Sequence, residues 1–295
     1  MHIGRVNPPR VIAVVGPTAA GKSALGLTLA KALGGEVVNA DAMQCYVGMD
    51  IGTAKLPPDG REGITHHLLD IWPVREPASV ADYQRRAVAV VQELLDRGVS
   101  PVVVGGSGLY LRALLDDLVL PPTDPAIRAG LEAELAVGGP GALHRRLALA
   151  DPAAAQAMLP SNGRRIVRAL EVVALTGSFS ATRPDGRYRW AATVQFGVSR
   201  PDLAERIEAR VAQMFRAGLV EEVSGLLAKG LADGPTARKA LGYAQLLAMP
   251  DDPVAAAQAT VRATRRYARR QRSWFRVDHR IVQIESAEQA LAAVK

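Results

Sequence analysis

A phosphate-binding loop is the clearest chemical signal in the sequence. It follows the apolar run 11–15 and reads Gly16-Pro17-Thr18-Ala19-Ala20-Gly21-Lys22-Ser23, with the spacing G-x-x-x-x-G-K-[ST]. The glycines let the backbone turn its N–H groups toward an anion, and Lys22 adds a positive charge on the terminal phosphate. Leucines at helical spacing follow, so the anion would also lie at a helix N-terminus. We therefore expect these eight residues to bind a phosphorylated ligand, with the Ser23 hydroxyl binding Mg²⁺.

Asp41 is the most informative carboxylate. It follows the short apolar run 37–38, which we expect to form the strand next after the phosphate loop. An aspartate after a strand is often only a turn-former or a helix cap. Because this one should lie at the carboxyl edge of the sheet, facing the bound phosphate, it suits a general base acting on a nucleophile beside the phosphates.

Basic side chains gather in three places. They are Arg164, Arg165 and Arg168; Lys239, just before Gly242-Tyr243; and Arg262, Arg265, Arg266, Arg269, Arg270, Arg272 and Arg276. In the last stretch, helical spacing predicts one arginine face, with the aromatic residues Tyr267, Trp274 and Phe275 turned elsewhere. A charge run is usually a solvated surface. This one has almost no acid to balance it until Asp278, which favours contact with nucleic-acid phosphates.

Two absences narrow the chemistry. Hydrolytic P-loop enzymes usually hold Mg²⁺ with an aspartate at the end of an apolar strand. The best such strand, 102–104, ends in Gly105-Gly106 instead, and Asp70 is only a weak substitute for the missing aspartate. This favours a transferase over a motor or switch protein. His66 and His67 are adjacent and would point to opposite faces of a strand, so we interpret them as structural or substrate-lining rather than as metal ligands.

Strand and helix signals alternate in the first part of the chain. Buried strands are predicted at 11–15, 37–38, 66–71 and 101–104, and a capping box at Ser79 and Asp82 opens a helix that closes at Gly98. Such alternation is typical of a parallel, doubly wound α/β sheet. The predicted fold is therefore a P-loop NTPase-like α/β domain, with a parallel sheet flanked by helices.

A helical insertion interrupts this pattern. From Asp124 to about Leu175 the periodicity is helical only, with an N-cap and first-turn proline at Asp151-Pro152 and a C-cap at Gly177. Strand character returns at 191–196, and helices then follow to the end apart from a short strand at 280–284. We therefore predict a catalytic core at 1–121 and 190–295, with a helical C-terminal part, and an insertion domain at 122–189.

Composition sets the remaining bounds. The 295 residues carry 36 Lys and Arg against 29 Asp and Glu, a net charge of +7 that suggests a polyanionic partner. The single Cys45 excludes an intrachain disulfide framework and a Cys-rich zinc module. No run is long and apolar enough to span a bilayer, and the N-terminus lacks a signal-peptide core. We expect a cytoplasmic, monomeric protein with no membrane partner.

Several motifs together resemble the tRNA dimethylallyltransferase family. They run through nearly the whole chain: GPTAAGKS, DAMQCYVGMDIGTAK, HHLLDI, VGGSGLYLRALL, RRIVRALEV, LGY and ARRQRSWFR. A P-loop alone fits many proteins, whereas GMDIGTAK and VGGSGLY at these spacings do not.

The resemblance implies transfer of a dimethylallyl group from dimethylallyl diphosphate to the exocyclic amine of the adenosine 3′ of the tRNA anticodon. It implies that the loop holds the diphosphate with Mg²⁺, that Asp41 is the base, and that Arg210 is a diphosphate arginine. It also implies tRNA contacts at Asp41, Ala42, Met43, Gln44, Ser107, Arg128, Arg164, Arg165, Ile166, Val167, Arg168, Lys239, Gly242 and Tyr243. To these we add Arg265 and Arg269 from the basic helix, whose arginines we assign to tRNA phosphates.

Departures from the family and alternative functions remain. Ala42 stands where the family usually has Ser, and Ser107 where Thr is common; the zinc finger of eukaryotic relatives is absent. One alternative is a small-molecule kinase with ATP in the loop, and another is an enzyme that prenylates free AMP or ADP. Neither explains the basic stretches, because a small substrate needs none. A non-catalytic RNA-binding P-loop protein would explain them but leaves Asp41 without a role.

Overall fold

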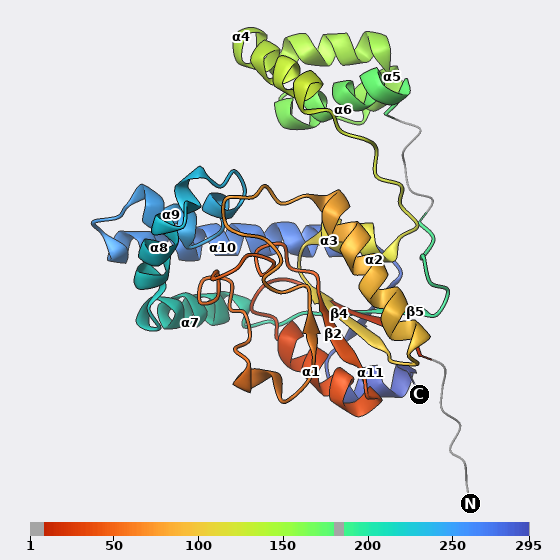
Figure 1. Ribbon diagram of the computed structural model, residues 1–295, viewed down its shortest axis with the longest axis vertical. Coiled ribbons are helices and arrows are strands. Elements are labelled where there is room, and N and C mark those ends of the chain that lie inside the picture. Colours follow the sequence, from red (N-terminus) through yellow and green to blue (C-terminus); the bar gives the residue numbers. More distant parts are fainter. Residues whose placement is uncertain (1–8, 180–185, 295) are drawn as a thin grey trace, which may run out of the picture. The chain divides into compact units, whose positions relative to one another are not determined.

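A computed structural model of the chain describes residues 9–179 and 186–294. The chain divides into two compact units, a core of residues 1–115 with 188–295 and an insertion of residues 116–187 (Figure 1). The sequence placed the first boundary about six residues later, at Pro121-Pro122. Residues 180–185, within the predicted insertion, lie outside the described part of the chain.

One parallel sheet organises the core. Its strands are β1 (Val11–Val15), β2 (Glu36–Asn39), β3 (His66–His67), β4 (Pro101–Gly105), β5 (Thr193–Val198) and β6 (Ile281–Ile284), in the spatial order β3-β2-β4-β1-β5-β6. All pairs are parallel, with β1 between β4 and β5. The predicted α/β fold is confirmed. The central place of β1 brings its carboxyl end, where the phosphate loop starts, to the middle of the sheet.

Helices make up most of the rest of the chain. They are α1 (Lys22–Leu33), α2 (Val80–Asp96), α3 (Gly108–Leu115), α4 (Pro125–Ala150), α5 (Pro152–Gln156), α6 (Gly163–Thr176), α7 (Leu203–Arg216), α8 (Leu219–Ala228), α9 (Tyr243–Ala248), α10 (Pro253–Arg276) and α11 (Ala287–Val294). The Ser79 hydroxyl caps α2 by accepting from the Asp82 amide, and Asp151 caps α5 in the same way. These are the caps that the sequence predicted.

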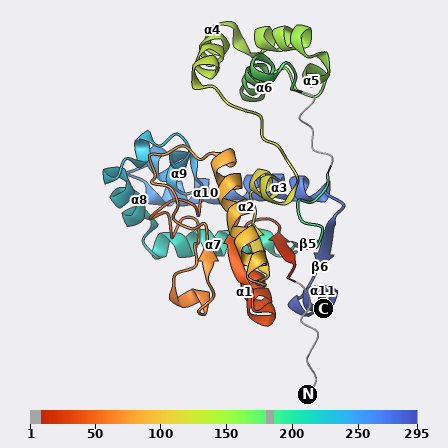
Figure 2. The same ribbon diagram turned by 45° about the vertical axis from the view of Figure 1, so that its right-hand side comes forward.

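The two faces of the sheet bury alternate residues of β1. Ile12 and Val14 pack with residues of α1 and α11, and Val11, Ala13 and Val15 belong to the larger core beneath α2 and α3. Figures 1 and 2 show α1 and α11 on one face of the sheet and α2 and α3 on the other. Because both faces are covered, the strands are continuous apolar runs rather than alternating ones.

The strand predicted at 66–71 is shorter than expected. Only His66 and His67 pair with β2, because the chain then enters left-handed conformations at Leu68 (φ 64°) and Asp70 (φ 57°). His67 lies 2.6 Å from a carboxylate oxygen of Glu36, and His66 contacts the Ile64 carbonyl. Each histidine therefore has a structural partner close by.

The insertion is a separate helical unit. Helices α4, α5 and α6 surround a core that includes Leu131, Leu147 and Ile166, and α4 bends at Gly139, where φ is 71° and Pro140 follows. None of the helices in residues 9–179 and 186–294 combines the length and apolar character needed to cross a membrane.

Candidate active site

The phosphate loop joins the end of β1 to the start of α1. Gly16 has φ 146°, and a Cβ atom there would lie 2.4 Å from the Val198 carbonyl oxygen, so only glycine fits beside β5. Gly21 caps α1 with φ 96°. Lys22 is the first helical residue, and its ammonium donates to the Pro17 carbonyl across the loop at 2.8 Å. The first-turn amides of α1 have no carbonyl partner within the helix and are therefore available to an anion.

Two cations and one carboxylate meet at this loop. Burial lowers the pKa of Lys22 from 10.5 to about 8, with Asp41 raising it and Arg210 lowering it. Burial also lowers the pKa of Arg210, and Asp41 again opposes the shift. Arg210 comes from α7, about 190 residues along the chain from Lys22. Such desolvated positive charge is what an anionic group needs.

Asp41 is held in place by its own backbone. The buried Asn39 amide accepts from the Asp41 N–H at 2.9 Å and donates to the Asp41 carbonyl at 3.1 Å. One carboxylate oxygen of Asp41 accepts from the Met43 N–H at 3.0 Å, so the turn-forming role is also present. The carboxylate lines a cavity, and no described residue forms an ion pair with it. It is therefore oriented and still open to a ligand.

Two adjoining cavities share these residues. The larger, of about 840 Å³, is lined by the phosphate loop, Gln44, Lys55 and Arg206. The smaller, of about 280 Å³, is lined by Ser107, Lys239 and Tyr267 together with the apolar Ile207, Val211 and Met214. Residues common to both are Thr18, Asp41, Thr53, Arg210 and Met214. Asp41 and Arg210 therefore lie where a phosphorylated ligand in one cavity would meet a second substrate in the other.

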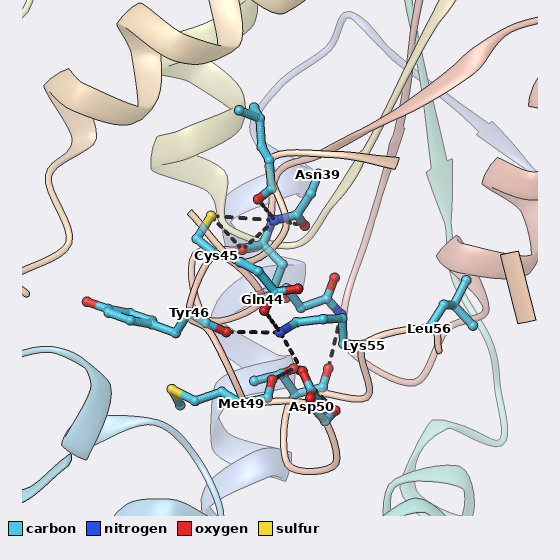
Figure 3. A network of polar contacts seen from close by, with 12 residues as sticks. Asn39, Gln44, Cys45, Tyr46, Met49, Asp50, Lys55 and Leu56 are labelled. Carbon is cyan, nitrogen blue, oxygen red and sulfur yellow. Dashed lines mark hydrogen bonds and ion pairs between the residues drawn. The ribbon is translucent and has the colours of Figure 1, made fainter. Parts of the chain in front are cut away.

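The segment 50–55 forms a wall of both cavities and is tightly fixed. The carboxylate of Glu222 accepts from the amides of residues 50, 51 and 52, at 3.0, 2.7 and 3.2 Å, and from the Tyr243 hydroxyl. The buried Lys55 ammonium donates to the Tyr46 carbonyl at 2.9 Å and to Asp50 at 2.6 Å, as Figure 3 shows. It also donates to Asp70 at 2.6 Å. Asp70 therefore neutralises a buried lysine, which leaves it poorly suited to the magnesium role considered above.

Sequence reasoning missed four residues that support the site. Arg206 lines the larger cavity and donates to the Ala19 carbonyl at 2.8 Å. The others are Asn39 and Glu222, described above, and Gln271, which bonds the phosphate loop from α10. The charge of Arg206, one helical turn from Arg210, was a usable signal. Asn39 lies two residues before Asp41, the spacing of an Asx turn, whereas nothing in the spacing of Glu222 and Gln271 indicates their partners.

The geometry around Ser23 fits a magnesium ion that is bound mainly through a ligand. Ser23 is exposed beside Lys22 and lines the larger cavity. Within the described ranges 9–179 and 186–294, no cluster of three His, Cys, Asp or Glu residues could bind a metal by itself. Mg²⁺ commonly takes one or two protein ligands and completes its shell with phosphate oxygens and water. A single hydroxyl at a phosphate site is compatible with that pattern.

The predicted tRNA residues of the insertion differ in their availability. Arg164 and Arg165 are exposed at the start of α6, whereas Ile166 and Val167 are buried in the core of the insertion. Arg168 donates to Glu171 and to the carbonyls of residues 121 and 122. Any RNA contact at 166 and 167 is therefore limited to the backbone, because their side chains pack internally.

Glu171 is a buried acid between two arginines. Its carboxylate accepts from Arg128 at 2.7 Å and from Arg168 at 2.8 Å. Desolvation raises its pKa, but the hydrogen bonds from Thr123, Arg128 and Arg168 together have the larger effect and lower the pKa to about 2. The guanidinium groups of Arg128 and Arg168 are therefore committed to structural ion pairs. The three-residue spacing of Arg168 and Glu171 on α6 was a usable signal, whereas Arg128 lies 43 residues from Glu171 and gave none.

The basic helix α10 corrects two expectations. Arg269 is exposed as predicted, but Arg265 pairs with Glu208 of α7, so an acid distant in sequence balances part of the run. The exposed Trp274 lines a surface hollow with Arg266, Arg269 and Arg270. The aromatic residue is therefore not turned away from the basic face, because residues four and eight apart on a helix share a face.

The predicted RNA contacts in the core are also unequal. Met43 and Lys239 line the smaller cavity, and the Ser107 hydroxyl accepts from the Ala42 amide at 3.1 Å. Gln44 lines the larger cavity and donates to the Thr53 carbonyl. Gly242 and Tyr243 are buried, and the Tyr243 hydroxyl bonds Glu222. Tyr243 therefore supports the wall at 50–52, and its side chain is not available to RNA.

Known proteins resemble this chain over most of its length. A family model described as IPP transferase matches residues 44–278. A protein of Parafrankia sp. named tRNA dimethylallyltransferase is 60% identical over 286 residues, covering 96% of this chain and 90% of the relative. One of the same name from Streptomyces coelicolor is 61% identical over 279 residues, covering 92% and 89%.

Solved structures show the same similarity. The full-length tRNA isopentenylpyrophosphate transferase of Bacillus halodurans matches with a TM-score of 0.67 and 37% identity, covering 97% of this chain and 94% of that one. A eukaryotic dimethylallyltransferase acting on tRNA matches with a TM-score of 0.80 and 25% identity, covering 97% and 78%. Since the family model spans most of the chain and the relatives match it almost end to end, the chain belongs to the IPP transferase family.

Proposed function

We propose that this protein transfers a dimethylallyl group from dimethylallyl diphosphate to the exocyclic amine of the adenosine 3′ of a tRNA anticodon. The observation that carries the proposal is that Asp41 and Arg210 line both cavities, with Lys22 close to them in the larger one. The bacterial relatives are named tRNA dimethylallyltransferase, and the eukaryotic structural relative acts on tRNA.

These residues can accept the proton and stabilise the leaving group of this reaction. The amine nitrogen attacks the first carbon of the dimethylallyl group as the bond from that carbon to the diphosphate oxygen breaks. The amine proton goes to Asp41, and diphosphate leaves with the bonding electron pair. Lys22, Arg210 and the first-turn amides of α1 stabilise the negative charge that develops on the leaving group. Mg²⁺ bound to the diphosphate and Ser23 would neutralise more of that charge.

The smaller cavity suits an extruded base. Its apolar side chains Ile207, Val211 and Met214 favour a ring or a prenyl group, and Ser107 and Lys239 supply polar contacts. An adenosine within an RNA loop must leave its stack to reach Asp41, and exposed arginines such as Arg269 would hold the surrounding phosphates. We expect a monomer, and size-exclusion chromatography tests this.

Product analysis tests the proposal. The protein is mixed with Mg²⁺, dimethylallyl diphosphate and either unmodified tRNA or AMP, and the products are weighed by mass spectrometry. We expect the gain of one five-carbon prenyl unit on tRNA only. A tRNA with guanosine at the target position serves as the substrate control. Prenylation of AMP but not tRNA would contradict the RNA substrate. In a parallel mixture with ATP in place of dimethylallyl diphosphate, phosphoryl transfer to AMP would support a kinase instead.

The role of Asp41 has its own variant. Asp41→Asn should slow single-turnover transfer by about two to four orders of magnitude, the usual contribution of a positioned general base, while tRNA affinity changes little. Asp59→Asn, in an exposed turn, is the matched control. Near-normal transfer by Asp41→Asn would remove Asp41 from the chemistry.

A further inference from the structure

Gln271 joins the phosphate loop to the loop after β4. Its side chain lies on α10, is only 5% exposed, and reaches two segments distant in sequence. Its amide oxygen accepts from the Thr18 N–H at 2.9 Å, and its amide nitrogen donates to the Gly106 carbonyl at 2.9 Å. One buried side chain therefore bridges the two loops that follow neighbouring strands β1 and β4.

The space around this bridge is closely shaped. A Cβ atom at Gly106 would lie 2.3 Å from the Gln271 amide nitrogen and 3.2 Å from the Gly16 carbonyl oxygen. Glycine at 106 therefore lets the amide lie directly against the backbone. The site needs an acceptor for Thr18 and a donor for Gly106 at the same time, and a carboxamide offers both, whereas an ionised carboxylate offers no donor.

The bridge also determines which amides of the phosphate loop remain for a ligand. The Thr18 N–H is used by Gln271, and the Ala20 N–H contacts the Pro17 carbonyl at 3.4 Å. The first-turn amides of α1 are left as donors to an anion. Thr18 itself lines both cavities, so a shift of this residue would change the width of the site where they meet.

The helix that carries Gln271 also bonds Ser107, in the loop after β4. One turn earlier, Tyr267 bonds Ser107, whose hydroxyl accepts from the Ala42 amide next to Asp41. Arg269 and Arg272 are exposed on the same helix. The inner face of α10 therefore contacts the phosphate loop directly and is linked to the loop of Asp41 through Ser107, while its outer face presents arginines to solvent.

We propose that Gln271 is a positioning residue for the donor: it holds the Thr18 end of the phosphate loop against Gly106 in the geometry that binds diphosphate. The identity of the donor as a prenyl diphosphate rests on the proposed function. Binding of inorganic diphosphate tests the positioning role without it.

The test compares three variants. Gln271→Met keeps the length of the side chain and removes both hydrogen bonds. Gln271→Glu keeps the acceptor, loses the donor and adds a negative charge near the anion. Gln258→Met changes an exposed glutamine on the same helix and is the matched control. Diphosphate binding is measured by calorimetry with Mg²⁺, and steady-state kinetics gives KM separately for donor and for tRNA.

Loss of two hydrogen bonds, each of ordinary strength, should weaken diphosphate binding by Gln271→Met about 5- to 50-fold and raise the donor KM similarly. The tRNA KM should stay within about twofold, because the outer face of α10 is unchanged. Gln271→Glu should bind diphosphate more weakly than Gln271→Met because of charge repulsion. Gln258→Met should behave as the unsubstituted protein.

Two results would overturn the positioning role. One is diphosphate affinity of Gln271→Met within about twofold of the unsubstituted protein. The other is an equal rise in KM for donor and tRNA together with a lower melting temperature, which would make the residue merely structural. An unsubstituted protein that binds diphosphate but prenylates no RNA would refute the proposed function alone, and the binding arm would still decide the role of Gln271.

Discussion

We expect Lys22 to destabilise the ligand-free protein and to strengthen binding of diphosphate. The variant Lys22→Met separates the two effects. Burial lowers its pKa from 10.5 to about 8, so its charge is costly in the folded chain when no anion is bound. At neutral pH this lowering of the pKa corresponds to a loss of about 3 kcal/mol from the free energy of unfolding. Methionine removes the charge and keeps most of the side-chain length.

The net gain is smaller than this cost. The Lys22 ammonium also donates to the Pro17 carbonyl, and losing that charge-assisted hydrogen bond offsets about 1.5–3 kcal/mol. We therefore expect Lys22→Met to stabilise the ligand-free protein by up to about 1.5 kcal/mol, a rise in melting temperature of up to ~6 °C for the core unit. Lys31→Met, also on α1 but exposed and paired with Glu62 at the surface, should change stability by less than about 1 kcal/mol.

The effect has a defined pH window. A lysine whose folded pKa is lowered costs stability fully below that pKa, and the cost disappears as the pH rises to the unfolded pKa. The advantage of Lys22→Met should therefore be constant below about pH 8 and fade between pH 8 and 10.5. Thermal unfolding across this range measures it directly.

The same variant should lose its ligand. A charge-assisted hydrogen bond to a phosphate contributes about 1.5–3 kcal/mol, so diphosphate should bind roughly 10- to 150-fold more weakly. Binding is measured by calorimetry with Mg²⁺. A Lys22→Met protein that is less stable than the unsubstituted chain below pH 8, or that binds diphosphate normally, would refute the assignment of Lys22 to a desolvated anion site.

Other charged residues give three further predictions. Arg269→Ala should flatten the dependence of log tRNA affinity on log salt by about one unit, and the ion-paired Arg265→Ala by less; equal or absent changes would contradict the RNA assignment of α10. Glu222→Gln should weaken the wall at 50–52 and raise amide hydrogen exchange there, with unchanged protection as the contrary result. Glu171→Gln should destabilise the insertion by about 3–5 kcal/mol, seen as faster proteolysis of residues 116–187. Because the pKa of Glu171 is lowered to about 2, its contribution is complete above its usual 4.5 and is lost as the pH falls toward 2, so a protease-resistant variant at pH 7 would contradict it.

Local patterns in the sequence were sufficient for much of the fold. The phosphate loop, the cap of α2 at Ser79 and the proline after Asp151 all lie within a few residues of the groups they contact, so spacing alone identifies them. The alternation of strand and helix predicted the parallel sheet for the same reason. The predicted length of β3 was wrong. The chain leaves the sheet in a left-handed turn at Leu68 and Asp70, and Asp70 is bound there by Lys55, 15 residues away.

The site divides along the same line. Lys22 and Asp41 were predictable because a motif or an adjacent strand places each of them. The contacts of Gln271 with Thr18 and of Glu222 with residue 50 join positions 253 and 172 residues apart, and no local period records such a pair. The acids that neutralise Arg168 and Arg265 were missed for different reasons. Glu171 is near Arg168 in sequence but is buried, and Glu208 lies on a different helix from Arg265. Residue type and spacing determined which groups could do the chemistry. The packing of α7 and α10 on the phosphate loop, and of α8 on residues 50–52, decided which of them are oriented, because hydrogen bonds and burial depend on distance in space.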